Sequence, residues 1–199
     1  SGLGGVINIK RGHYEFDMKG QEGACIGSVN GDSELFIVYC DMDIYSGISN
    51  GTIIGSVNGD ADIKLENISA KLQGAGNIIT GIGTIAGNSC MVRLENVNIS
   101  SNIRAKECYG IGCRAGRTNI YIGYAAVKSV VQGKSAVAFG NSVMSAKLYC
   151  SNADVGTNAV TEFNSDIGAL EKNIQLENGR AEFILNGQEV KRQILTARL

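Results

Sequence analysis

Hydrophobic and polar residues alternate in short runs along nearly the whole chain. In "ADIKLENISA" (61–70) and "CMVRLENVNIS" (90–100), apolar side chains stand at every second position. An alternation of period two indicates a β-strand with one buried face. The pattern therefore predicts an all-β protein made of many short strands.

The strand pattern repeats at a nearly constant interval. The phrase "ACIGSVNGD" (24–32) returns as "TIIGSVNGD" (52–60). Glycines that follow Ile or Phe recur at intervals of 28, 28, 29 and 28 residues, at Gly27, Gly55, Gly83, Gly112 and Gly140. A unit of this length cannot bury its own apolar side and must stack on copies of itself.

Aligning the repeats places like residues in columns. One inward column is Ile7, Leu35, Ile63, Val92, Ile120, Leu148 and Ile174, and a second is Ile9, Ile37, Leu65, Leu94, Ile122, Cys150 and Leu176. We therefore predict a single-stranded, right-handed parallel β-helix of about seven coils over residues 1–180. Residues 181–199 are predicted to form a capping hairpin, with its turn at Asn186-Gly187, and a tail.

The corner after the first strand of each coil favours asparagine. Tyr39 and Tyr124 take this position in two coils, and the predicted ladder of stacked amides comprises Asn67, Asn96, Asn152 and Asn178. Asparagine corners, glycine anchors and aliphatic stacks resemble the parallel β-helix proteins, which include pectin-degrading enzymes, adhesins and phage tailspikes. The "GIG … NG … I-x-L/I-x-N" phrase resembles Gly-rich repeats in modular proteins of gut bacteria. That resemblance implies a module attached to surface or regulatory domains.

Composition excludes several classes of function. Lys and Arg number 18 against 19 Asp and Glu, so we predict no direct nucleic-acid binding by this segment. No apolar run is long enough to cross a bilayer, so no membrane insertion is predicted. The chain opens in strand-like sequence without Met, and we expect an upstream domain in a longer protein.

The six cysteines lack the paired spacings of a zinc site. The closest pair, Cys108 and Cys113, is interpreted as two small buried apolar residues. Unpaired thiols slightly favour a reducing cytoplasm, and the cell surface or a secreted location is the alternative. Localisation therefore stays open.

The strongest catalytic candidates are Asp41 and Asp43, which the repeat places near His13, Glu15 and Lys71. We interpret this patch as a solvated face with complementary charges, and we predict no catalytic residues and no cofactor. Asp32 and Asp60 follow Asn-Gly turns, as calcium ligands do in some solenoids. Because Asn88 and Arg117 take the equivalent positions, we predict no metal site.

A third column, between the two inward ones, points outward and carries the strongest binding signal. Its central members are Phe36, Lys64, Arg93, Tyr121 and Tyr149, flanked by Asn8 and Gln175. Sugar rings stack on aromatic faces, and protein partners favour Tyr and Arg. The alternative interpretation is that these side chains only strengthen the sheet face.

Together these patterns predict a non-enzymatic binding or interaction module of a larger bacterial protein. Its partner is expected to be a carbohydrate or a protein, bound on an exposed sheet face. One alternative is a cytoplasmic sensory or interaction domain of a transcriptional regulator. A second alternative is a polysaccharide lyase or hydrolase, which commonly groups carboxylates on one outer face of this fold.

Overall fold

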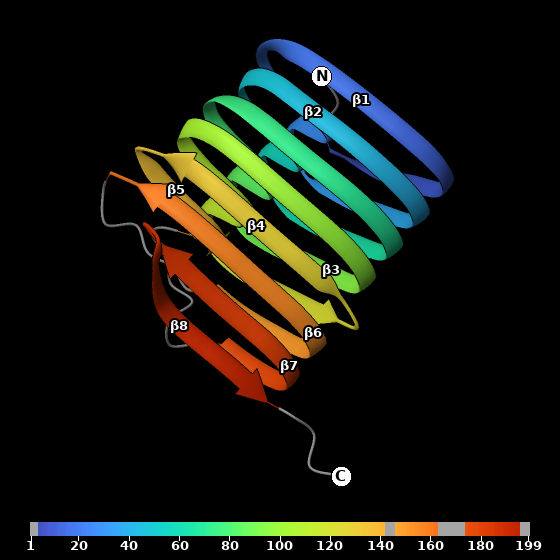
Figure 1. Cartoon of the computed structure of the whole chain (residues 1–199). Helices are drawn as coiled ribbons and strands as arrows, with labels where there is room; N and C mark the ends of the chain where they lie inside the picture. The colour runs from blue at the N-terminus through green and yellow to red at the C-terminus, as the bar shows by residue number, and fades with distance from the viewer. Residues whose placement is uncertain (1–3, 142–145, 163–173, 196–199) are drawn as a thin grey trace.

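A computed structural model describes residues 4–141, 146–162 and 174–195. Figure 1 shows a rod of stacked coils that runs from the N-terminal end to the C-terminal end of the chain. Within the described ranges every regular element is a strand, and none is a helix long and apolar enough to cross a membrane. The strands are β1 (Gly5–Asn30), β2 (Ser33–Asn58), β3 (Ala61–Gly123), β4 (Ala126–Gly133), β5 (Ser135–Gly140), β6 (Ala146–Thr161), β7 (Ile174–Leu185) and β8 (Gln188–Leu195).

Neighbouring coils pair in parallel, and the register is the one that the columns predict. Ile7 pairs with Leu35, Leu35 pairs with Ile63, and Ile120 pairs with Leu148. The inward members Leu35, Ile63 and Ile120 are buried. The prediction of an all-β solenoid of stacked parallel coils is confirmed, with about six turns where about seven were expected.

Each coil has three extended runs, which in the second coil are 33–38, 40–48 and 51–57. The backbone bends after the first run at a residue with positive φ, such as Tyr39 at 57° or Asn67 at 54°. The first two runs alternate buried and exposed side chains. Every residue from Gly51 through Val57 is buried, and the equivalent run 79–85 is buried throughout as well. These runs consist of isoleucine, valine and small residues without a charged side chain, a composition that is compatible with burial on both faces.

The anchor glycines stand at a bend inside the third run. Gly55 and Gly83 have φ values of 139° and 140°, a conformation that L side chains rarely adopt. A Cβ on Gly55 would lie 1.8 Å from the carbonyl oxygen of Gly83 in the next coil. The glycine repeat therefore follows from close backbone stacking along the rod.

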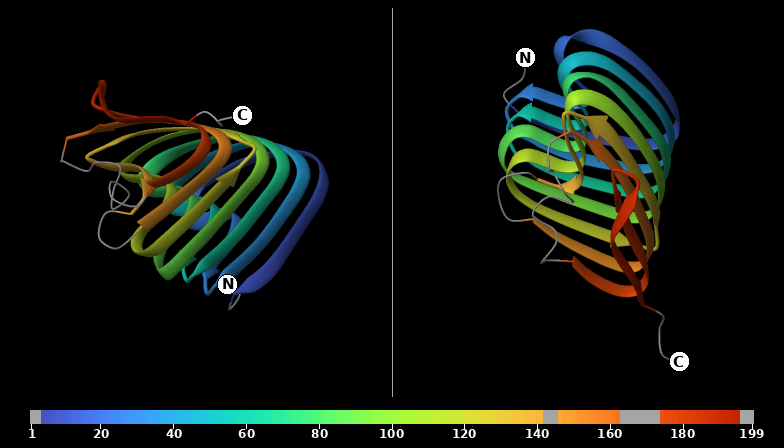
Figure 2. Two further views of the ribbon diagram at one scale, coloured as in Figure 1. Left: turned by 90° about the horizontal axis from the view of Figure 1, so that it is seen from below. Right: turned by 60° about the vertical axis from the view of Figure 1, so that its left-hand side comes forward.

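The C-terminal end of the rod is a hairpin. β7 pairs with β6 in parallel on one edge and with β8 antiparallel on the other. Asn186 and Gly187, with φ of 49° and 79°, form the turn between β7 and β8, as the Asn-Gly pair predicts. Figure 2 shows β8 lying along the last coil at this end.

Candidate functional site

The outward column lies on the first run of successive coils, and we call it the strip. It consists of Phe36 on β2, Lys64, Arg93 and Tyr121 on β3, and Tyr149 on β6. Phe36 pairs with Lys64 and Tyr121 pairs with Tyr149, while Lys64, Arg93 and Tyr121 line one shallow groove. The structure therefore brings all five predicted residues onto one sheet face.

The N-terminal half of the strip is occupied by its own contacts. The Lys64 ammonium lies 4.9 Å from the centroid of the Phe36 ring and 2.9 Å from Glu66 Oε2. Arg93 Nη1 donates to Asp62 Oδ1 at 2.6 Å, and Nη2 contacts the Met91 sulfur. Both cations are thus paired with carboxylates on neighbouring outward positions. This half has the contacts expected of a stabilised sheet face.

The C-terminal half of the strip is a stacked pair of tyrosines. The rings of Tyr121 and Tyr149 are 5.0 Å apart between centroids, with 4° between their planes, and Tyr121 is 40% exposed. Each ring uses one face for the other. The pair is partly exposed, and both rings line a surface groove.

Two grooves flank this pair, and Tyr121 and Glu95 line both. The groove that also contains Tyr149 is lined by Gly123, Ser151 and Glu177 as well. Glu95 and Glu177 were missed as candidates from the sequence. The sequence did contain an indication of them, because aligning the repeats places Glu95, Gly123, Ser151 and Glu177 in one outward column, where two small residues separate the two glutamates.

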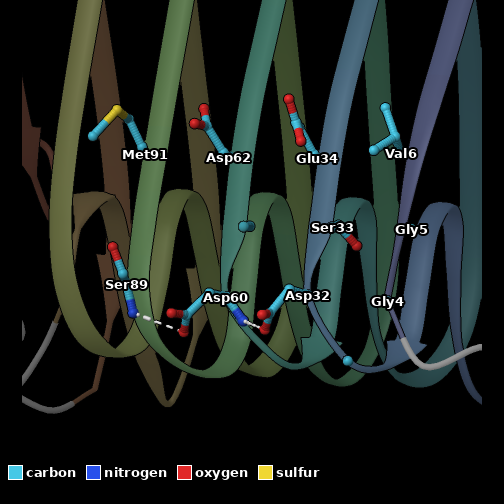
Figure 3. A pocket seen from close by; sticks show the side chains of 12 residues that line it. Gly4, Gly5, Val6, Asp32, Ser33, Glu34, Asp60, Asp62, Ser89 and Met91 are labelled. Carbon is cyan, nitrogen blue, oxygen red and sulfur yellow. Dashed lines mark hydrogen bonds between the residues drawn. The ribbon is translucent and has the colours of Figure 1, made fainter.

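A third groove lies near the N-terminal end of the rod, and its lining includes Asp32, Glu34, Asp60 and Asp62 (Figure 3). Asp32 Oδ1 accepts a hydrogen bond from the Asp60 amide at 2.9 Å. Asp60 Oδ1 accepts from the amides of Asn88 and Ser89 at 2.7 and 3.0 Å. Each repeated aspartate therefore fastens the turn of the next coil. Over the described ranges, no three His, Cys, Asp or Glu side chains are grouped to hold a metal ion.

The polar patch suggested by the sequence also forms, on the second run of the first three coils. His13 pairs with Asp41, Glu15 pairs with Asp43, and Asp43 pairs with Lys71. His13 Nε2 lies 3.2 Å from Glu15 Oε1. All five side chains are exposed, as on the solvated face that the sequence indicated.

The corner asparagines bond along the rod in two pairs. Asn96 Nδ2 donates to Asn67 Oδ1 at 2.5 Å, and Asn178 Nδ2 donates to Asn152 Oδ1. Tyr124 separates the pairs and is 65% exposed, with φ of 47°. It directly follows Gly123, so it stands at the corner beside the tyrosine groove.

All six cysteines are free, and five of them are buried. Burial raises the pKa of Cys150 to about 12 and, against a smaller opposing effect of hydrogen bonds, the pKa of Cys108 and Cys113 to about 11. These thiols stay protonated near neutral pH and are poor nucleophiles. They act as small apolar side chains of the core.

Comparison of the chain with protein-family models, with curated proteins and with solved structures finds no match. The function must therefore be argued from the geometry of the strip and its grooves.

Proposed function

We propose that the chain is a non-enzymatic binding module of a larger bacterial protein, and that it binds a carbohydrate across the Tyr121–Tyr149 pair. The observation that carries this proposal is a stacked, partly exposed tyrosine pair that lines a shallow groove with carboxylates beside it. Aromatic rings and hydrogen-bonding side chains on a flat surface suit the apolar faces and hydroxyl groups of sugars. The resemblance to Gly-rich repeat modules of gut bacteria belongs to the same proposal.

The alternative function, a polysaccharide lyase or hydrolase, has weaker structural support than the binding module. Its best candidates, Asp41 and Asp43, are exposed on a sheet face. Such chemistry normally places its carboxylates around a bound substrate, with the pKa of the general acid raised. The tyrosine groove offers the better enclosed surface.

Glycan binding tests the proposal. The wild-type chain and the double variant Tyr121→Ala/Tyr149→Ala are compared on a panel of neutral, cationic and anionic oligosaccharides. We expect the double variant to weaken binding about tenfold or more, since each ring contributes on the order of 1 kcal/mol. Tyr45→Ala is the matched control, because Tyr45 is also 40% exposed but lies on the second run. Absence of binding to any glycan, or equal loss in the control, contradicts the proposal.

A further inference from the structure

Resting on the proposed carbohydrate site, we propose that its ligand is a cationic amino sugar, recognised by Glu95 and Glu177 together with the tyrosine pair. The column next to the strip supplies the geometry. Gly123 pairs with Ser151, and Ser151 pairs with Glu177. Two small residues therefore separate two glutamates and leave a notch beside the rings.

The Glu95 side chain bends toward this notch. A Cβ on Gly123 would lie 2.3 Å from Glu95 Oε2, so the Glu95 carboxylate covers the position where Gly123 has no side chain. Glu177 borders the opposite end, three coils away, or roughly 14 Å along the rod at the usual strand spacing. The notch is thus bounded by a carboxylate at each end and by the Tyr121–Tyr149 pair along one side.

Both carboxylates lack a cationic partner in the described part of the chain. Neither Glu95 nor Glu177 belongs to an ion pair there, and the groove's described lining contains no Lys or Arg. The nearby cation Arg93 is bound to Asp62. Lys147 lies on the other side of Tyr149 along β6, so the strip separates it from the notch.

This charge distribution discriminates between classes of sugar. A uronic acid would bring a carboxylate to a groove that already has two. An ammonium group gains from each carboxylate and from the negative face or hydroxyl of a tyrosine. Exposed ion pairs contribute little individually, roughly two- to fivefold in affinity for each carboxylate. We expect about tenfold from both together.

The test measures binding of tetraglucosamine, its fully N-acetylated form, tetragalacturonate and tetralysine by calorimetry at about pH 6. We expect tetraglucosamine to bind roughly tenfold tighter than the acetylated form, and tetragalacturonate to bind more weakly than either. The preference should shrink between about 0.02 M and about 0.5 M salt because the exposed charges are screened.

Variants assign the preference to the two glutamates. Glu95→Gln/Glu177→Gln should reduce tetraglucosamine binding to the level of the acetylated sugar and leave the acetylated sugar unaffected. Glu34→Gln, an exposed position on the same face outside the notch, should change neither. The inference is overturned if wild type binds both sugars equally, if the preference survives in the double variant, or if tetralysine binds as tightly as tetraglucosamine.

The acetylated sugar distinguishes the two proposals. If it binds in a manner that depends on Tyr121 and Tyr149 while no preference for the ammonium form exists, this inference fails and the proposed carbohydrate function stands. If no sugar of the panel binds, both fail.

Discussion

Tyr124 occupies a corner where four other coils place asparagine. Its φ of 47° lies in the left-handed region, which Asn tolerates and a bulky side chain disfavours. Its ring is largely exposed and interrupts the amide ladder between Asn96 and Asn152. Tyr39 takes the same corner in the second coil with φ of 57° and is also exposed, so a tyrosine at this corner does not by itself indicate binding.

We predict that Tyr124→Asn stabilises the protein by about 0.5–2 kcal/mol. The change removes left-handed strain and adds an amide that can bond to the neighbouring corner amides. Denaturant unfolding of both proteins measures the difference. Asn96→Ala is the opposite change, and we expect it to lower the free energy of unfolding by about 1–3 kcal/mol. A destabilised Tyr124→Asn would show that the tyrosine ring makes a stabilising contact.

Because its thiols are buried, we predict that the protein loses free energy of unfolding at alkaline pH, and Cys150 is the clearest case. The pKa of Cys150 is about 12 in the folded protein, raised by burial from an ordinary value of 9.0. The folded chain therefore keeps this proton where the unfolded chain releases it. The raised pKa therefore contributes to the free energy of unfolding. This contribution is fully present below about pH 9 and is lost as pH rises through about 12.

Comparison with Cys150→Ala isolates this contribution from the other groups that titrate in alkali. Between pH 9 and pH 11 we expect wild type to lose about 2–3 kcal/mol more than the variant, at about 1.4 kcal/mol per pH unit for one thiol. Urea unfolding at several pH values measures the two slopes. Parallel slopes would mean that the Cys150 thiol is solvated in the folded state.

At the scale of the element, the anchor glycines give the sharpest contrast. A Cβ on Gly83 would lie 1.7 Å from the carbonyl oxygen of Gly112, whereas a Cβ on Gly156 would have no neighbour within 4 Å. Gly83 has positive φ, and Gly156 does not. Gly83→Ala requires two coils to move apart, while Gly156→Ala only reduces the freedom of the unfolded chain.

We therefore predict a loss of more than about 3 kcal/mol for Gly83→Ala, or failure to fold, and a change within about 1 kcal/mol for Gly156→Ala. Thermal unfolding followed by circular dichroism measures both. Similar stabilities for the two variants would contradict the close stacking at Gly83.

The runs with alternating side chains could be predicted from the sequence, because an apolar side chain there marks a buried position and a polar side chain marks an exposed one. Leu35 and Ile63 fall in one column by counting alone, and they pair in the structure. Burial of the whole run 51–57 could not be predicted, because the repeat pattern does not indicate which segment packs on the face of this run that points away from the core. The predicted coil count was close, and the last coil is short because the chain turns back into β8 after Leu185.

The candidate site was predictable only in part. Counting placed Tyr121 next to Tyr149, but the groove beside them depends on small residues in two consecutive coils and on the direction of the Glu95 side chain. Likewise, the pairing of Arg93 with Asp62 joins different columns in neighbouring coils. A search confined to one column at a time could not find contacts that cross columns.

At the scale of the whole molecule, the rod depends on its ends, because a stack of coils has an unpaired strand edge wherever it stops. At the C-terminal end, β8 covers β7 from Gly179 to Leu185 (Figure 1). The β8 sequence, QEVKRQIL, carries Glu189, Lys191 and Arg192. Charged residues on an outer strand are a common means of preventing edge-to-edge pairing.

Removal of residues 186–199 should therefore expose the β7 edge and cause association between copies of the chain. Backbone N–H and C=O groups of that edge lose their partners in β8 and find them in another molecule. Sedimentation velocity over a range of concentrations should show larger species for this variant, whereas a chain ending at residue 195 keeps β8 and should sediment as wild type does. If the shortened chain sediments like wild type at every concentration and unfolds at the same temperature, β8 does not protect the edge, and the first two runs of the last coil must be stable with that edge in water.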